Sequence, residues 1–202
     1  MITEVIFDLE TKQLFSDVGS HDPRKLGVSV LSLYQRRVDD NINEIEGSMQ
    51  SFWEADFPKL WPILEQADRI IGFNSLHFDV PALQPYAPFD LKTLPHFDIL
   101  DIVKNVYGRR VGLSVLARDT LKHTKSDIGI NAVLYWAKGD QKSLDELKSY
   151  CEMDVATTRD LYDYGLKHKK LIFRNKWNMM EEIAVDFSYV KKAGKNQQIG
   201  LF

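Results

Sequence analysis

The chain has 202 residues, of which 44% are hydrophobic and 11% aromatic, a composition that excludes global disorder and allows one compact domain with a sizeable core. The single cysteine, Cys151, excludes an intramolecular disulfide and a cysteine-based zinc site, and it favours a reducing, cytoplasmic setting. No apolar run approaches the length of a membrane span, so we expect no membrane partner.

The formal net charge of -3 hides an uneven distribution. Residues 1–101 hold 8 Lys and Arg against 17 Asp and Glu, whereas residues 102–202 hold 18 against 12. The basic half suits a polyanionic substrate, and the reacting phosphate would need metal ions to approach the acidic half. An ordinary solvated surface is the alternative.

The first part of the chain predicts antiparallel strands. Residues 2–9 are rich in β-branched and aromatic side chains, and residues 26–34 form a second such run after a turn at Asp22-Pro23. The polar segment Asp39-Asp40-Asn41 suggests a hairpin turn before a short edge strand at 43–46.

The following segments predict a crossover. Residues 52–67 carry apolar side chains at helical spacing, although Pro58 and Pro62 delay or kink the helix. Residues 69–73 predict a buried strand, and residues 74–87 a loop that enters a helix. Strand, helix and strand in this order imply a parallel crossover, so the fold class is α/β, a mixed sheet flanked by helices.

In the second half, apolar periodicity continues on both sides of a basic loop at 108–110, and residues 131–138 predict a short helix. The sequence Ser143-Leu144-Asp145-Glu146 matches a capping box and predicts one long helix to about His168. From Leu171 to Phe202, aromatic side chains stand among basic ones, which is typical of a strand-rich appendage or a docking arm.

The segment Phe7-Asp8-Leu9-Glu10-Thr11 places two carboxylates around one leucine. On a strand, Asp8 and Glu10 point to one face while Phe7 and Leu9 point to the other. Two such carboxylates need a cation, a shared proton or generous solvent. An exposed acidic edge is the alternative.

Further acidic residues follow later in the chain. Tyr150 and Asp154 stand four residues apart on the long helix and therefore share one face. Asp79, with Pro81 in the same first turn, taken alone is typical of a helix start, and Asn74 of a capping residue in a loop. Only the combination with Asp8 and Glu10 suggests a metal site. The apolar stripe beside Asp154 consists of Leu147, Cys151, Val155 and Thr158.

Three segments together resemble the DnaQ-like 3′-5′ exonucleases with four acidic residues, in the DEDDy branch whose third motif carries tyrosine. The segments, in order, are Phe7-Asp8-Leu9-Glu10-Thr11, Gly72-Phe73-Asn74-Ser75-Leu76-His77-Phe78-Asp79 and Tyr150-Cys151-Glu152-Met153-Asp154. The histidine branch does not fit, because its base lies five residues before the last aspartate, where this chain has Ser149.

The resemblance covers residues 1–168, and within the family this segment is similar to the proofreading domain of family B DNA polymerases. It implies a ribonuclease H-like mixed five-stranded sheet flanked by helices over residues 1–170, with residues 171–202 as a small C-terminal extension.

The resemblance also implies two divalent ions, Mg²⁺ or Mn²⁺, held by the metal ligands Asp8, Glu10, Asp79 and Asp154. Asp8, Glu10 and Asp154 would hold the ion that binds the attacking water, Asp8 would bridge, and Asp79 would act mainly on the second ion. In a two-metal site, one ion generates hydroxide and the other stabilises the leaving 3′ oxygen. Tyr150 would complete the catalytic set by orienting the water, because a phenol with a pKa of about 10 is a poor base at neutral pH.

For the substrate, the resemblance implies a 3′ single-stranded end, with DNA favoured over RNA and a helicase or polymerase as a candidate partner. Asn74 and the backbone near Leu9 and Thr11 would face the terminal nucleotide, with Phe78 or Leu9 against its base. Asp98 would be a candidate for a supporting role. The predicted phosphate track consists of Arg109, Arg110, Arg118, Lys122 and Lys125. Two alternatives remain: a catalytically silent nucleic-acid-binding or interaction module of the same fold, and an endonuclease.

Overall fold

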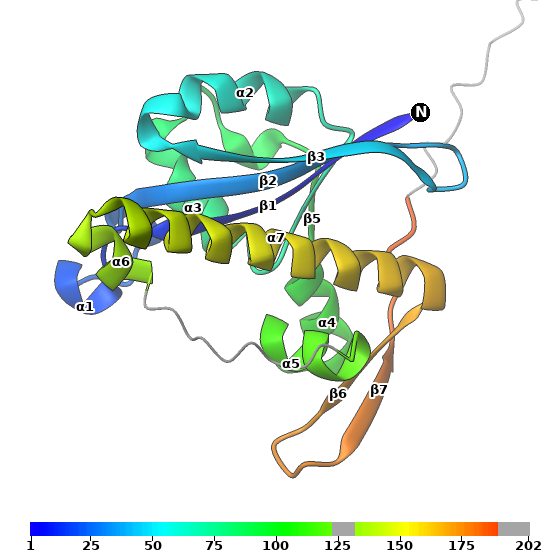
Figure 1. Ribbon diagram of the computed structural model, residues 1–202. Helices are drawn as coiled ribbons and strands as arrows, with labels where there is room; N and C mark the ends of the chain where they lie inside the picture. The colour runs from blue at the N-terminus through cyan, green and yellow to red at the C-terminus, as the bar shows by residue number, and fades with distance from the viewer. Residues whose placement is uncertain (123–131, 190–202) are drawn as a thin grey trace, which may run out of the picture.

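The computed structural model describes residues 1–122 and 132–189. Its main sheet has five strands in the order β3-β2-β1-β4-β5 (Figure 1). The strands are β1 (Ile2–Thr11), β2 (Val28–Val38), β3 (Glu44–Trp53), β4 (Arg69–Gly72) and β5 (His96–Asp98). Strands β1, β2 and β3 run antiparallel to one another, whereas β4 pairs parallel with β1 and β5 parallel with β4. The predicted mixed five-stranded sheet is therefore confirmed.

Helices cover both faces of this sheet (Figure 1). They are α1 (Phe15–Val18), α2 (Phe57–Glu65), α3 (Asp79–Leu83), α4 (Ile99–Tyr107), α5 (Leu113–Thr120), α6 (Ala132–Lys138) and α7 (Gln141–His168). Short 3₁₀ turns lie at Pro23–Lys25, Glu54–Asp56, Gln84–Tyr86 and Leu91–Thr93. The long helix α7 crosses one face and packs on β1, β2 and β4, whereas α2 and α3 pack against the other face. No helix among the described residues is both long and apolar enough to cross a membrane.

Strand β1 divides the core into two layers. Val5, Phe7 and Leu9 pack with α2 and α3 in one hydrophobic cluster. Ile6 packs in a second cluster with side chains from α4, α5 and α7. Because successive side chains of a strand alternate between faces, the face of β1 that carries Ile6 also carries the next two even-numbered residues, Asp8 and Glu10.

A C-terminal hairpin of β6 (Lys170–Arg174) and β7 (Met180–Ala184) joins the second cluster. Phe173 and Phe187 are buried there, and the Phe187 ring lies 5.2 Å from that of Phe97 on β5. The chain after α7 therefore belongs to the packed body as far as Phe187. A division of the chain near residue 170 stays a prediction.

The boundaries of several elements differ from the prediction. The edge strand is not confined to 43–46, because β3 continues to Trp53, and β2 extends to Val38 instead of ending at 34. Most of β3 is exposed at the sheet edge, so its sequence lacks the alternation that marks a half-buried strand. The helix predicted over 52–67 begins only at Phe57, with Pro58 in its first turn, where proline is tolerated.

The start of the long helix is three residues earlier than the capping box predicted. Asp140 is the N-cap residue, and its carboxylate accepts hydrogen bonds from the backbone N–H of Ser143 at 3.0 Å and from the Ser143 hydroxyl at 2.8 Å. Ser143 is thus the third residue of the helix rather than its cap. Helix α6 agrees with the predicted 131–138, except that residue 131 lies outside the described residues.

Candidate metal centre

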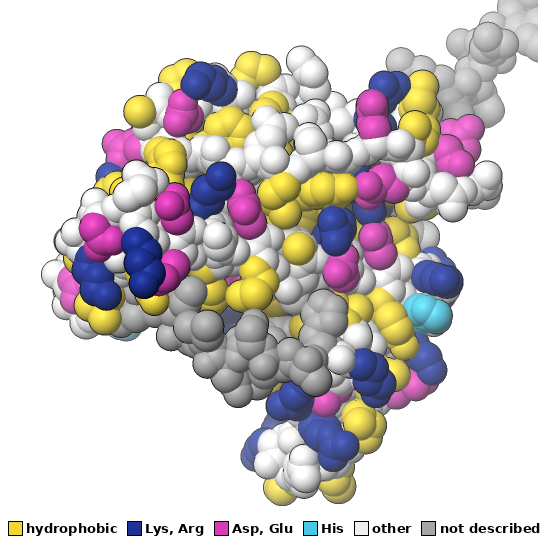
Figure 2. Space-filling model, viewed as in Figure 1, with side chains coloured by type: hydrophobic (Ala, Val, Ile, Leu, Met, Phe, Trp, Pro, Cys, Tyr) yellow, Lys and Arg dark blue, Asp and Glu magenta, His cyan; other side chains and the backbone are white. Residues whose placement is uncertain are grey.

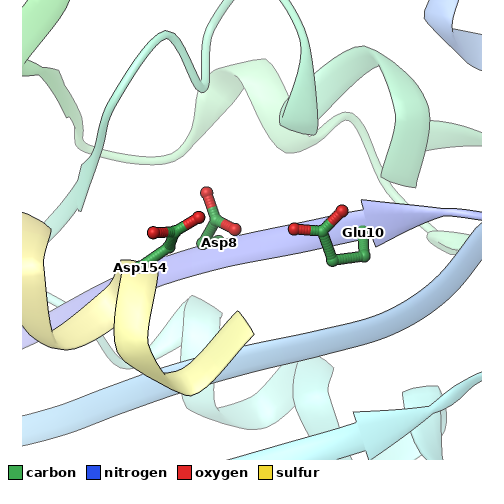
Figure 3. A group of neighbouring side chains, drawn as sticks. All are labelled: Asp8, Glu10 and Asp154. Atoms are coloured by element: carbon green, nitrogen blue, oxygen red, sulfur yellow. The ribbon is translucent and has the colours of Figure 1, made fainter. Parts of the chain in front are cut away.

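Three carboxylates meet where β1 passes under α7. One oxygen each of Asp8, Glu10 and Asp154 lies within 4.8 Å of the other two. Figure 3 shows Asp8 and Glu10 rising from the same face of β1, with Asp154 reaching toward them from the helix. All three are partly buried. The group forms because strand alternation brings together residues two apart, and the helix adds a third from the far end of the chain.

Helix α7 is fixed on the sheet by a buried stripe and by polar contacts. Cys151 is fully buried, and its thiol donates a hydrogen bond to the backbone carbonyl of Asp8 at 3.4 Å. Farther along the helix, Asp163 forms an ion pair of 2.6 Å with the buried Arg36 of β2. Because both ends of the segment are anchored, the position of Asp154 over β1 is determined by the core.

Asp79 is a fourth carboxylate beside this group. It is the first residue of α3 and only 4% exposed, and its Oδ1 accepts a hydrogen bond of 3.2 Å from the backbone N–H of Leu9. This bond ties the start of α3 to β1 between Asp8 and Glu10. Asp79 lies outside the compact group of three, but its charge acts on Asp8.

The electrostatics of the four carboxylates are unfavourable. Burial and the charges of Asp79, Glu10 and Asp154 raise the pKa of Asp8 well above its usual value. Burial, with Asp154 and Asp79, raises the pKa of Glu10 from 4.5 to about 8. Burial raises the pKa of Asp79 to about 7 and also raises that of Asp154, although a hydrogen bond from Tyr150 offsets part of the latter rise. A cation would relieve this repulsion.

The donor set fits a hard cation. Carboxylate oxygens are the ligands that Mg²⁺ and Mn²⁺ prefer, and the grouped oxygens supply several within reach of one ion. Tyr150, half-buried one turn before Asp154, adds a hydroxyl. Burial and the neighbouring charges of Asp154, Glu10 and Asp8 raise the pKa of Tyr150, so it keeps its proton at neutral pH.

Asn74 and Arg110, two predicted substrate contacts, lie together. The Asn74 side-chain oxygen accepts a hydrogen bond from Arg110, and Asn74 has the left-handed φ of 65°. Asp98 holds this loop, because its carboxylate accepts hydrogen bonds from the backbone N–H of Asn74 at 2.9 Å and of Leu76 at 3.0 Å. The same carboxylate caps α4. Asp98 therefore supports the loop that leads to Asp79.

The other predicted nucleotide contacts differ in exposure. Leu9 is 4% exposed and packs in the core beside Phe7, so its side chain offers little surface to a base, and that contact stays a prediction. Thr11 is buried, and its hydroxyl donates to the carbonyl of Gln13 at 3.0 Å. Phe78 is half-buried and meets the ring of Phe15 edge to face, so it keeps some exposed surface.

The predicted phosphate track is described in part. Arg109 and Arg110 are exposed in the loop between α4 and α5, and Lys122 is exposed after α5. Arg118 is half-buried and pairs with Asp119 at 2.7 Å, while Lys125 lies outside the described residues.

Sequence reasoning assigned no role to Lys12, which follows directly on Thr11. Its ammonium pairs with Glu54 and lies 5.1 Å from the centre of the Trp136 ring on α6. The end of β1 is thereby tied to the helix next to α7. Its position at the end of the first motif is the signal that could have drawn attention to it.

Comparison with known proteins agrees with this fold. A search of curated proteins gives no match. One solved structure, the family B DNA polymerase from the hyperthermophilic archaeon Pyrobaculum calidifontis, is similar over 82% of this chain with a TM-score of 0.56 and 18% identity. At that identity the likeness shows the fold alone, and it spans only 25% of the polymerase chain. The family model described as the RNase H superfamily matches residues 5–165, which is most of the chain, and the chain therefore belongs to the RNase H superfamily.

Proposed function

We propose that this protein is a metal-dependent 3′-5′ exonuclease that hydrolyses phosphodiester bonds at the 3′ end of single-stranded nucleic acid, with DNA favoured over RNA. The observation that carries the proposal is the grouping of Asp8, Glu10 and Asp154 beside Asp79. Membership of the RNase H superfamily supports nuclease chemistry. The exonuclease assignment adds the resemblance of the three motifs, above all the third motif with Tyr150.

In this proposal Asp8, Glu10 and Asp154 hold one Mg²⁺ or Mn²⁺ ion, and Asp79 helps to hold a second from its place beside Asp8. Such ions supply a water of lowered pKa as nucleophile and neutralise the charge on the leaving oxygen.

The protein's own side chains orient the reactants. Tyr150 keeps its proton and can donate a hydrogen bond, so it positions the water rather than accepting a proton from it. Asn74 and Arg110, which contact each other, would bind the sugar and phosphate of the terminal nucleotide. Phe78 would meet its base with the surface that its packing leaves exposed.

The experiment uses 5′-labelled single-stranded DNA and RNA with Mg²⁺ or Mn²⁺, the wild-type protein and Asp8→Asn. We expect a ladder that shortens from the 3′ end with the wild-type protein only, and that chelation abolishes. Cleavage of a circular single strand would indicate an endonuclease instead. Tight binding without any shortening would favour the catalytically silent binding module and refute the proposal.

The same proposal includes the setting of the enzyme. We propose that it acts in the cytoplasm on 3′ ends that a helicase or polymerase presents. The likeness to one quarter of a polymerase chain supports this only at the level of fold, because related folds serve many functions.

A further inference from the structure

The tip of the β6–β7 hairpin exposes large apolar side chains. Trp177 is 61% exposed, Met179 55% and Met180 49%. The hairpin projects from the body beyond α5 in Figure 1, and it lies after the last residue of the superfamily match. Exposed apolar side chains that are grouped on a protein surface often mark interaction sites, whereas single exposed ones are common and need no explanation. The tip is therefore a candidate interaction site.

The turn at the tip is held in one conformation. The side-chain oxygen of Asn175 accepts hydrogen bonds from the backbone N–H of Trp177 at 2.9 Å and of Met179 at 3.1 Å. Its amide nitrogen donates to Glu181 at 2.7 Å. Because the turn is already ordered, presenting Trp177 to a ligand costs little conformational entropy.

The first strand of the hairpin, β6, is fixed to the body as far as the turn. The backbone N–H of Arg174 donates to Asp119 at 2.7 Å, and the Thr120 hydroxyl bonds both the N–H and the carbonyl of Ile172, at 2.9 and 2.6 Å. On the other side of the strand, Phe173 is buried in the core. Both β6 and the turn that follows it are therefore held in place, and a ligand at Trp177 would keep a defined position relative to the sheet.

The charge around the tip favours a polyanion. The Lys176 ammonium lies 4.4 Å from the centre of the Trp177 ring and forms no ion pair with any residue that the structure describes. The acidic side chains nearby are already bonded, Glu182 to Lys170 and Glu181 to the amide of Asn175. Figure 2 shows Lys and Arg side chains gathered over this lower part of the molecule, next to hydrophobic ones.

A series of contacts links the tip to the metal centre. The Tyr107 ring packs edge to face on Phe173 of the hairpin, with 4.9 Å between ring centres, and it precedes the loop that carries Arg109 and Arg110. Arg110 in turn bonds Asn74, in the loop that leads to Asp79. The hairpin, the arginine loop and the carboxylates are thus consecutive neighbours. A strand of nucleic acid with its 3′ end at the carboxylates could follow the same series outward.

We infer that the hairpin tip binds the single-stranded part of the substrate upstream of its 3′ end, with Trp177 stacking on a base and Lys176 neutralising a phosphate. The identity of the substrate rests on the proposed function, whereas the role of the hairpin is additional to it. Stacking of a base on an indole tolerates any sequence, which suits an enzyme that removes nucleotides one after another. Because the hairpin is the outermost member of this series of contacts, beyond the loop of Arg109 and Arg110, we expect only longer oligonucleotides to reach its tip.

The test measures binding by fluorescence anisotropy in the presence of a chelator, with labelled oligothymidylates of about 4 and about 20 nucleotides, lengths that bracket common single-strand sites. We expect Trp177→Ala to weaken binding of the long oligonucleotide about 5- to 100-fold and to leave the short one unchanged. The control is Ile45→Ala, an exposed apolar residue on β3, which should change neither.

A second measurement tests the charge. Lys176→Ala should reduce the slope of log affinity against log salt by about 0.7, the value for one phosphate contact on a single strand. Lys59→Ala, an exposed lysine of α2 on the opposite face of the sheet, should leave the slope unchanged. Equal affinity of Trp177→Ala and wild type for the long oligonucleotide, or an equal loss for both lengths, would overturn the inference. Because binding is measured without hydrolysis, absence of nuclease activity would refute the proposed function and not this one.

Discussion

Replacing Glu10 by glutamine should stabilise the metal-free protein while abolishing its activity. The reason is that burial, and after it the charges of Asp154 and Asp79, raise the pKa of Glu10 from 4.5 to about 8. Glutamine has nearly the same shape and carries no charge, so it removes both the buried charge and the repulsion without leaving a cavity. A functional group that opposes folding is a common cost of an active site.

The size of the effect follows from the shift. One pKa unit corresponds to about 1.4 kcal/mol, so a rise from 4.5 to about 8 sets a ceiling of about 5 kcal/mol on the cost of ionising Glu10 in the folded state. Glu10 is only partly buried, and solvent screens a partly exposed charge. We therefore expect Glu10→Gln to raise the free energy of unfolding by about 2 kcal/mol at pH 8. For a chain of this length the gain corresponds to a rise in Tm of about 4 to 8 °C.

The difference in stability between Glu10→Gln and wild type depends on pH. A carboxyl group whose pKa is raised in the folded state contributes its full stability below the unfolded pKa, and that stability is lost as pH rises toward the folded pKa. For Glu10 this window runs from 4.5 to about 8. The difference in free energy of unfolding between Glu10→Gln and wild type should thus be small at pH 5 and largest at pH 8. Asp79→Asn should show the same trend, because the pKa of Asp79 is raised to about 7.

Divalent metal should reverse the order of stability. An ion at a concentration of one hundred times its Kd stabilises the folded protein by about 2.7 kcal/mol, and it binds the ionised carboxylates. Thermal unfolding at pH 5 and pH 8, with chelator and with Mn²⁺, measures all four combinations. A metal-free variant that is less stable than wild type at pH 8 would refute the reasoning, as would an equal gain from Mn²⁺ in both proteins.

Three further substitutions test other parts of the structure. Tyr150→Phe should lower kcat about 100-fold, as loss of one oriented hydrogen bond does; an unchanged kcat would exclude an orienting role. Gly165→Ala should lower the free energy of unfolding by about 1 to 3 kcal/mol in urea titrations, because a Cβ there would lie 2.1 Å from the Phe187 ring, and a neutral result would show that this ring can move. Arg36→Met should cost about 3 to 5 kcal/mol, since it leaves the fully buried Glu4 without its ion pair of 2.7 Å; retained stability would indicate that other partners suffice for Glu4.

The arrangement of β1 was predictable because a single rule decides it. Alternation along a strand assigns Val5 and Phe7 to one face and Asp8 and Glu10 to the other, whatever the rest of the chain does. Helical periodicity likewise indicated the buried stripe that faces the sheet, in which Cys151 is fully buried. What local rules could not supply is the meeting of the two elements, since β1 and α7 are joined by long-range packing.

Errors of boundary have a different cause. The strand β3 is mostly exposed and polar, so packing against β2 and not hydrophobic pattern determines how far it extends. At the start of α7, both Asp140 and Ser143 are good capping residues. With Asp140 as the cap, the helix gains about one turn, and the backbone N–H of Leu144 donates a hydrogen bond to the carbonyl of Asp140. The capping-box pattern alone could not reveal this.

The case of Leu9 shows how a resemblance and a physical rule can disagree within one sequence. Alternation requires that Leu9 point away from the carboxylates on either side of it, toward the layer formed by α2 and α3. The expectation that its side chain meets a base came from the resemblance, and the core position leaves little of that side chain exposed for such a contact. The backbone of Leu9, unlike its side chain, contacts the site, because its N–H donates a hydrogen bond to the Asp79 carboxylate. Leu9 therefore acts in two ways: its side chain packs β1 against the core, and its main chain fixes the fourth carboxylate beside the other three.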